Sequence, residues 1–320
     1  MSLLLTLLFT IVSYNCENLF DCRHDSLKND TEFLPNSSHH WDFGRYWKKL
    51  NNIGRVIQQC GSATSPGTLP DIVALLEVEN DSTLFMLTKR SMLKGAGYKY
   101  VMTNSPDVRG IDVAVIYNPL TFRLEKSYSI RPDIESIRPD IENVKTRDIL
   151  YVRGVMRARD TLHIFVVHAP SRRNGKSATE GYRMYVEQRM MQSVDSIRNV
   201  NPDAKIVLVG DFNDYSNDKA LKDIVSRGFV EISNGIKGLN YNKTKVSGTY
   251  KYQGVWNSLD HIFLSTAAQH QVERCFIYDA AWLLEDDNQG GYKPFRTYLG
   301  PKYHEGISDH LPVVLQLKLE

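Results

Sequence analysis

The sequence lacks several features that would assign a protein to a class at once. No segment approaches the ~20 apolar residues that a membrane-spanning helix needs, so we expect no membrane span. The formal net charge is only +2, so composition by itself does not indicate a nucleic-acid-binding protein. The chain also has no nucleophile elbow, no P-loop and no dinucleotide-binding fingerprint. The substrate class must therefore be argued from the side chains of a site.

Cysteine is scarce as well. The four cysteines are Cys16, Cys22, Cys60 and Cys275, and none of them forms a C-x-x-C pair. They are too few for a disulfide-stapled fold or a structural zinc site. We predict free or buried thiols, and a Cys16–Cys22 disulfide stays open as the alternative for an exported protein.

The rest of the composition is that of an ordinary globular protein, with 42% apolar and 24% charged residues. The 320 residues would suffice for two domains, but large α/β folds often form one, so we assign residues 9–320 to a single domain and expect a monomer. Residues 1–12 have the apolar core of a signal peptide without its basic segment or cleavage site. Three interpretations stay open: residues 1–8 are a signal-peptide remnant of an exported protein, they are a cloning scar, or the segment is a long buried strand. Without export, we expect a cytoplasmic protein.

The stretch 205–214, which reads K-I-V-L-V-G-D-F-N-D, is the most informative one in the chain. Its β-branched run predicts a strand buried on both faces. Asp211 and Asn213 follow at the exit of this strand, where Gly210 lets the backbone turn sharply. Because they are two residues apart, the carboxylate and the amide can point the same way. A capped turn is the structural alternative, since Asp and Asn favour turns anyway.

The other elements alternate between strands and helices. Helical spacing occurs in residues 45–60, 82–94, 180–199 and 217–227, and we predict strands at 9–15, 70–77, 98–103, 112–117, 149–155, 162–167, 258–264 and 313–319. Several strands follow one another as hairpins, which indicates an α/β fold with mixed sheets. Residues 129–142 are a perfect tandem repeat of S-I-R-P-D-I-E. The proline in each copy argues against a strand interior, so we expect an enlarged surface loop there.

Polar side chains recur at the strand exits, and they share a chemistry of carboxylates, amides and histidines: Asn15, Glu77, His168, Asp211, Asn213, Asp260, Asp309 and His310. Carboxylate oxygens such as those of Glu77 and Asp309 suit a hard divalent cation, Mg²⁺ or alternatively Mn²⁺. Phosphoester hydrolysis uses this set, because a cation and neutral donors offset the charge on the phosphoryl oxygens. A histidine held by an aspartate can take a proton from the attacking water.

Six segments in order carry a resemblance to a known family: Y-N-C-E-N-L-F (14–20), P-D-I-V-A-L-L-E (70–77), V-V-H-A-P-S-R (166–172), V-G-D-F-N-D (209–214), S-L-D-H-I (258–262) and S-D-H-L-P (308–312). Together they resemble the endonuclease/exonuclease/phosphatase superfamily, to which deoxyribonuclease I belongs. The resemblance implies a four-layer α/β/β/α sandwich of two mixed β-sheets flanked by helices. It also places the active site at one end of the two sheets.

The resemblance further implies a role for each matching residue. Glu77 takes the metal-ligand position with Asn15 beside it, and Asp309 belongs to the metal and water shell. Glu17 is an auxiliary acidic group near them.

On the catalytic side, His310 is the implied general base and Asp260 orients it. Asp211 and Asn213 orient the nucleophile or leaving group and bind the phosphate, and His168 contacts the scissile phosphate. No core position of the pattern is missing, which argues against a binding protein without turnover.

Three arginines are candidates for substrate binding. Arg172 and Arg173 directly follow a catalytic segment, and a guanidinium is well shaped for phosphate. Arg109 precedes a strand and could reach a phosphate, although a surface hairpin explains it equally well. His39 and His40 lie in a polar loop, where we expect them to be solvated.

These observations predict a divalent-metal-dependent phosphoester hydrolase. We favour a phosphodiesterase or nuclease acting on nucleic acid. The alternative is a phosphatase or phospholipase C-like enzyme acting on inositol phosphates or sphingolipid head groups, and the fold alone does not choose between them.

Overall fold

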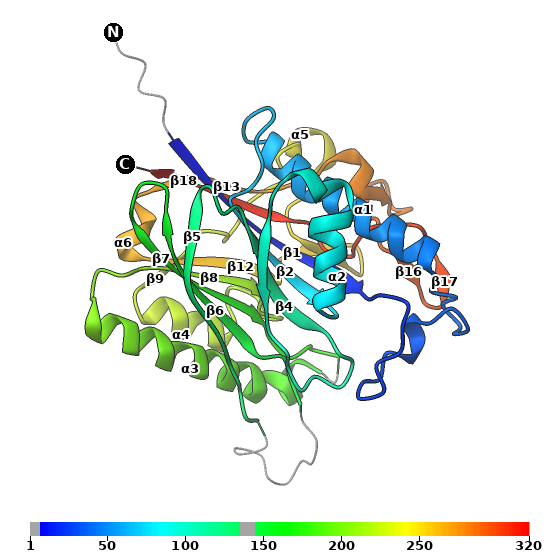
Figure 1. Ribbon diagram of the computed structural model, residues 1–320, viewed down its shortest axis with the longest axis horizontal. Helices are drawn as coiled ribbons and strands as arrows, with labels where there is room; N and C mark the ends of the chain where they lie inside the picture. Colours follow the sequence, from blue (N-terminus) through cyan, green and yellow to red (C-terminus); the bar gives the residue numbers. More distant parts are fainter. Residues whose placement is uncertain (1–6, 135–144, 174, 320) are drawn as a thin grey trace.

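Two six-stranded mixed β-sheets pack face to face at the centre of the protein (Figure 1). The computed structural model describes residues 7–134, 145–173 and 175–319. The first sheet has the order β13 (Val272–Ile277), β18 (Val313–Leu319), β1 (Leu7–Leu19), β2 (Ile72–Val78), β4 (Asp112–Tyr117) and β3 (Lys99–Met102). The second has the order β5 (Phe122–Ile130), β6 (Ile149–Met156), β7 (Thr161–His168), β8 (Lys205–Asp211), β12 (Asp260–Ser265) and β9 (Phe229–Glu231).

Each sheet contains a parallel pair of neighbouring strands near its centre. In the first sheet β1 runs parallel to β2, and in the second β7 runs parallel to β8. A parallel connection needs a long crossover, and helices α1 (Phe43–Ser62) and α3 (Lys176–Val200) lie in these two crossovers. The carboxyl ends of the four strands carry Asn15, Glu77, His168 and Asp211.

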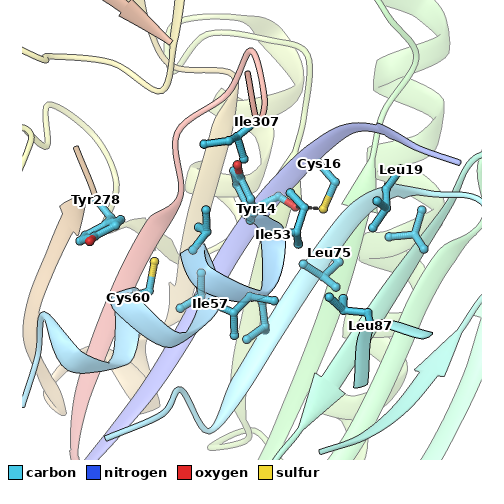
Figure 2. Close-up of a cluster of buried hydrophobic side chains, with 14 of the residues drawn as sticks. Tyr14, Cys16, Leu19, Ile53, Ile57, Cys60, Leu75, Leu87, Tyr278 and Ile307 are labelled. Atoms are coloured by element: carbon cyan, nitrogen blue, oxygen red, sulfur yellow. Dashed lines mark hydrogen bonds between the residues drawn. The ribbon is translucent and has the colours of Figure 1, made fainter. Parts of the chain in front are cut away.

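Helices cover the outer face of each sheet. Residues of α1, among them Ile53 and Ile57, pack against Leu75 of β2 on the outer face of the first sheet (Figure 2). On the second sheet, α3 and α4 (Lys219–Ser226) contribute side chains such as Met190 and Leu221 to a separate cluster. The order of layers is therefore helix, sheet, sheet, helix, which confirms the predicted four-layer sandwich.

Strand β2 shows why the apolar runs in the sequence are continuous. Val73 and Leu75 point into the cluster beneath α1, whereas Ile72, Ala74 and Leu76 point into the core between the sheets. Because side chains alternate between two buried faces, every position must be apolar. The same constraint applies to residues 206–209 of β8.

The remaining elements are short and lie in the connections: η1 (Thr31–Phe33), α2 (Asp81–Phe85), η2 (Met86–Arg90), η3 (Met92–Gly95), α5 (Tyr241–Thr244), β10 (Tyr250–Tyr252), β11 (Val255–Asn257), α6 (Thr266–Gln269), η4 (Ala281–Leu283), β14 (Leu284–Asp286), β15 (Tyr292–Pro294), β16 (Tyr298–Leu299) and β17 (Lys302–Tyr303). No helix in the described part of the chain is both long and apolar enough to cross a membrane.

Some expectations about local structure were wrong. The helix predicted at 82–94 is divided into an α-helical, a π-helical and a 3₁₀ turn, and Ser91, whose backbone is extended, separates the last two. Strand β5 was not predicted, since most of its side chains are exposed and give no apolar signal. It includes Ser129 and Ile130, the first two residues of the tandem repeat. Residues 135–142 of the repeat lie outside the described residues.

The structure shows where the first strand begins and that the cysteines are unpaired. Strand β1 begins at Leu7, where Leu7 and Leu8 pair with Leu319 and Lys318 of β18. Residues 1–6 lie outside the described residues. All four cysteines are free thiols, as predicted.

Candidate active site

The first sheet contributes a strained pair of strand ends. The ladder between β1 and β2 shifts register after Asn15, and the ladder between β2 and β4 shifts around Glu77. Glu17, Asn18 and Glu77 all have positive φ angles of 48°, 56° and 60°, a region that non-glycine residues seldom adopt. The Asn18 N–H donates to Glu77 Oε2 at 2.8 Å. This bulge takes Glu77 out of the hydrogen-bonded ladder and fixes its carboxylate at the carboxyl end of β2.

The second sheet contributes Asp211 and Asn213 at the end of β8. Asp211 Oδ1 accepts a hydrogen bond from the Asn213 N–H at 2.9 Å, and Asn213 Nδ2 donates to the Ala169 carbonyl at 3.1 Å. Asp211 Oδ2 accepts from Asn15 Nδ2 at 3.1 Å. Asn15 and Asp211 therefore join the two sheets at the site.

Gly210 is required by this geometry. Its φ is 138°, and a Cβ built on it would lie 2.0 Å from the Val167 carbonyl oxygen of the neighbouring strand. We expect Gly210→Ala to destabilise the protein by at least about 3 kcal/mol, measured by urea unfolding, because backbone strain and a backbone clash add. Gly181→Ala in α3 is the matched control, since nothing lies within 4 Å of its Cβ position. Equal unfolding midpoints for wild type and Gly210→Ala would show that the strand pair can relax.

Asp260 and His310 form a buried hydrogen-bonded pair. His310 Nδ1 lies 2.7 Å from Asp260 Oδ2, which also accepts from Thr249 Oγ1 at 2.6 Å. His310 Nε2 points away from this pair and lies 4.0 Å from Asp211 Oδ2, beyond hydrogen-bonding distance. The imidazole ring also stacks on Tyr250, with ring centroids 5.4 Å apart. The ring is thus fixed with Nε2 directed at the strand ends.

Burial and neighbouring charges shift the pKa values of His310 and Asp211. Burial opposes protonation of His310, but the carboxylate of Asp260 outweighs it and raises the pKa of His310 well above its ordinary value. Burial, and then Asp260, raise the pKa of Asp211 to about 7. Among the described residues, Asp211, Asp260 and His310 each offer a ligand atom within 4.8 Å of the others. Since His310 Nδ1 already bonds Asp260, we interpret this trio as a proton-transfer group.

His168 lies between the two sheets' carboxylates. Its Nε2 is 3.7 Å from both Glu77 Oε1 and Asp211 Oδ2. Burial, followed by the positive charges of Arg147 and Arg109, holds the pKa of His168 well below its usual range. A neutral imidazole that carries its proton on Nε2 can donate a hydrogen bond into the site.

The predicted metal ligands differ in how many of their oxygen atoms already have an ion-pair or hydrogen-bond partner. Glu77 Oε1 has only the neutral His168 nearby among the ion-pair partners in the described part of the chain. Asp309 Oδ2 is 3.0 Å from Arg296 Nη2, so it shares its charge with a guanidinium. Both ends of the Asn15 amide are used, because its Oδ1 accepts from the Glu17 N–H. The available donors are carboxylate oxygens, the ligand type that suits a hard divalent cation, and Glu77 is the one without a cationic partner.

Sequence reasoning missed several residues of the site. Arg296 bridges Asp309 and Glu17, with Nε 3.2 Å from Glu17 Oε1. The buried amine of Lys49 donates to the Glu17 carbonyl at 2.6 Å. Arg147 holds the His168 carbonyl, and Thr249 holds Asp260 as described above. None of these side chains comes directly after a long apolar strand, which was the signal used for the others.

The three predicted substrate arginines lie in different surroundings. Arg109 and Arg173 line a cavity of about 720 Å³ that also touches Glu17, Asn18 and Arg296. Arg172 stacks over Tyr215 at 4.2 Å and lies 3.7 Å from Asp218, and it is not among the residues that line this cavity.

Several solved structures share this fold over nearly their whole length. No curated protein matches the chain. Among solved structures, an endonuclease/exonuclease/phosphatase family protein from Bacteroides thetaiotaomicron has a TM-score of 0.62 and 16% sequence identity, and covers 98% of this chain and 99% of its own. A mannosyl-6-phosphatase from the same organism has a TM-score of 0.59 and 16% identity, with 96% and 98% covered. A humanized D. rerio TDP2 has a TM-score of 0.58 and 16% identity, with 97% and 99% covered.

At these identities the solved structures show the shared fold alone. A sequence model of one family adds to them, because it matches residues 10–319 and so spans both sheets and every candidate residue above. The chain belongs to the endonuclease/exonuclease/phosphatase family.

Proposed function

We propose that the protein is a phosphoester hydrolase that requires a divalent cation, Mg²⁺ or Mn²⁺, and uses His310 as the general base. The observation that carries the proposal is the buried Asp260–His310 pair, whose free Nε2 points at the Asp211 carboxylate. A water on that nitrogen can be deprotonated as it attacks phosphorus in line with the leaving oxygen. Asp260 fixes the imidazole tautomer and stabilises the imidazolium that forms.

The neighbouring side chains supply the other functions. His168 Nε2 and the Asn213 amide can donate hydrogen bonds to the phosphoryl oxygens, on which negative charge grows during the reaction. Asp211, with its pKa near 7, can be protonated and can then donate that proton to the leaving oxygen. When bound by Glu77 and Asp309, the cation would neutralise phosphate charge.

Nucleic acid is the first substrate candidate. Arg109, Arg173 and Arg296 beside the site suit a phosphate backbone. A phosphomonoester of a small polyol or sugar is the second candidate, because the arginines line a cavity of about 720 Å³, a size that suits a small molecule. That one structural neighbour is called a mannosyl-6-phosphatase agrees with this second candidate.

Lipid head groups have less support. A lipid phosphodiesterase would need an exposed apolar loop near the site, and the segment 292–298 is the candidate because it holds three aromatic residues. Its Tyr298 is buried and its Arg296 pairs with two carboxylates, so only Tyr292 presents an exposed large apolar side chain in this segment.

The test is a substrate panel with purified protein in Mg²⁺ and in Mn²⁺. It includes supercoiled plasmid, single-stranded oligonucleotide, inositol phosphates, mannose 6-phosphate and glycerol 3-phosphate. We expect hydrolysis of at least one of them, which a chelator abolishes and added cation restores. No turnover of any phosphoester in either metal would leave a binding protein as the better hypothesis.

A further inference from the structure

A lysine occupies an apolar position on the buried face of α1. Tyr46, Leu50 and Ile53 of this helix belong to the apolar cluster on the outer face of the first sheet. Lys49 lies on the same buried face, with only 2% of its surface exposed. Lysine is almost never buried to this extent without partners, because it is costly to remove an ammonium group from water. The partners of Lys49 therefore indicate why a charge is placed here.

Three uncharged acceptors surround the amine of Lys49. Its Nζ donates to the Glu17 carbonyl at 2.6 Å, to Thr297 Oγ1 at 2.6 Å and to the Ile307 carbonyl at 3.1 Å. Carbonyl oxygens only accept, and the Thr297 hydroxyl donates its own proton to the Ile307 carbonyl at 3.3 Å. Each of the three bonds thus needs a proton from Lys49. The amine is therefore the ammonium form, and all three of its donors are used.

The first acceptor belongs to the strand end that presents Glu77, the main proposed metal ligand. The N–H of Asn18 donates to Glu77 Oε2 at 2.8 Å. This N–H and the Glu17 carbonyl are the two polar groups of one peptide unit, which is planar and rigid. The unit accepts from Lys49 on one side and donates to Glu77 on the other. One peptide plane thus links the buried ammonium to the carboxylate.

The other two acceptors belong to the connecting segments that hold Asp309. Thr297 directly follows Arg296, whose Nη2 lies 3.0 Å from Asp309 Oδ2. Ile307 precedes Asp309 by two residues in the segment that leads to β18. The ammonium therefore fixes the backbone on both sides of the Arg296–Asp309 contact as well as the peptide that holds Glu77.

We propose that Lys49 is a positioning residue of the metal site. Its buried ammonium holds the end of β1 and the segments around Arg296 and Asp309 in the arrangement that binds the cation. It acts through the peptide unit and the loop backbone that it bonds, and it does not touch the cation. This inference rests on the proposed function, in which Glu77 and Asp309 bind the metal.

The sign of the effect on metal affinity separates positioning from simple electrostatics. Burial lowers the pKa of Lys49, and the carboxylates of Glu17, Asp309 and Glu77 oppose that change, so its charge acts on the proposed ligands. Removal of a positive charge near a cation site should by itself strengthen cation binding. Loss of positioning should weaken it, because a smaller fraction of the protein then has the binding arrangement. Weaker binding after removal of the ammonium therefore indicates positioning.

The experiment is a calorimetric Mn²⁺ titration of Lys49→Met without substrate, with circular dichroism as the folding check. Methionine has a similar length but no donor and no charge. We expect the Kd for Mn²⁺ to rise about 10–100-fold, as is usual when a supporting partner of a metal ligand is lost. Lys48→Met is the matched control, since Lys48 is the adjacent residue of α1 but is exposed and pairs with Glu305 on the surface. It should keep the wild-type Kd.

A second pair of variants covers the case in which Lys49→Met does not fold. Thr297 is 2% exposed, and Thr297→Val removes the hydroxyl that Lys49 bonds while keeping the shape of the side chain. Thr297→Ser keeps this hydroxyl. We expect Thr297→Val to raise the Kd for Mn²⁺ about 3–10-fold, the equivalent of one buried hydrogen bond, and Thr297→Ser to stay close to wild type.

The outcomes separate this inference from the proposed function. A folded Lys49→Met protein that binds Mn²⁺ as tightly as wild type, or more tightly, would overturn the inference even if its urea unfolding midpoint fell, because Lys49 would then serve stability alone. If Lys49→Met does not fold, equal Kd values for Thr297→Val and Thr297→Ser would overturn it. A wild-type protein that binds no Mn²⁺ would instead refute the metal requirement of the proposed function, and the inference with it.

Discussion

Replacing His310 by alanine should lower kcat for phosphoester hydrolysis by about 10²–10⁴-fold, the usual contribution of a positioned general base. The reason is geometric, because Asp260 binds Nδ1 and leaves Nε2 to face the attacking water. The substitution should leave the fold intact, since the main contacts of the ring are with Asp260 and Tyr250. Steady-state kinetics, with circular dichroism as the folding check, measure both effects. His270→Ala, at an exposed histidine, is the control and should keep wild-type activity.

The pH dependence gives a second readout for the same residue. His310 accepts a proton only when neutral, and Asp260 raises its pKa above the ordinary value, so activity should rise with pH through that raised pKa. Asp260→Asn removes the negative charge that raises the pKa, and the rising limb of the profile should move to lower pH as kcat falls. Near-normal turnover in His310→Ala, or a rising limb unmoved in Asp260→Asn, would count against His310 as the base.

Replacing Glu77 by glutamine should weaken the binding of the metal. The change removes one negative charge and keeps the shape, so the side-chain oxygen can still accept from the Asn18 N–H and preserve the bulge. We expect the Mg²⁺ concentration for half-maximal activity to rise by at least about 10–100-fold. Activity as a function of Mg²⁺ measures this shift, and calorimetric Mn²⁺ titration gives a readout independent of turnover.

Two further variants test whether the loss of metal affinity is specific to Glu77. Glu125→Gln, in β5 and not among the residues of the site, should keep wild-type metal affinity. Asp309→Asn should weaken metal binding less than Glu77→Gln, because Arg296 already shares the charge of Asp309. Unchanged Mn²⁺ affinity in Glu77→Gln would refute its assignment as the main ligand.

The sequence predicts those parts of the molecule whose constraints are local. Strands such as β2 and β8 are buried on both faces, so they appear as unbroken apolar runs, and the polar residues at their ends stand out. Strand β5 is mostly exposed and leaves no such signal. The helix predicted at 82–94 has the right apolar spacing, yet its backbone hydrogen bonds change type along the segment.

The same difference between local and long-range constraints explains which residues of the site the sequence revealed. Asn15, Glu77, His168 and Asp211 were found because each lies at a strand end. Arg296 and Thr249 reach the site from connecting segments, and their partners Glu17 and Asp260 lie 279 and 11 residues away, respectively. Contacts between a connecting segment and a strand have no fixed sequence spacing, and only the folded structure shows them.

Strand β18 and the loop before it come last in the described chain, but the strand lies inside the first sheet and the loop reaches the site. The strand inserts between β1 and β13, and the Ser308 hydroxyl donates to the Asn15 carbonyl at 2.7 Å. A ribosome-bound chain that has released only its first 300 residues would hold both central parallel pairs but no base and an open gap beside β1. Under the proposed mechanism, we therefore expect the nascent protein to be inactive until the late insertion of β18 completes the first sheet and brings His310 to the site.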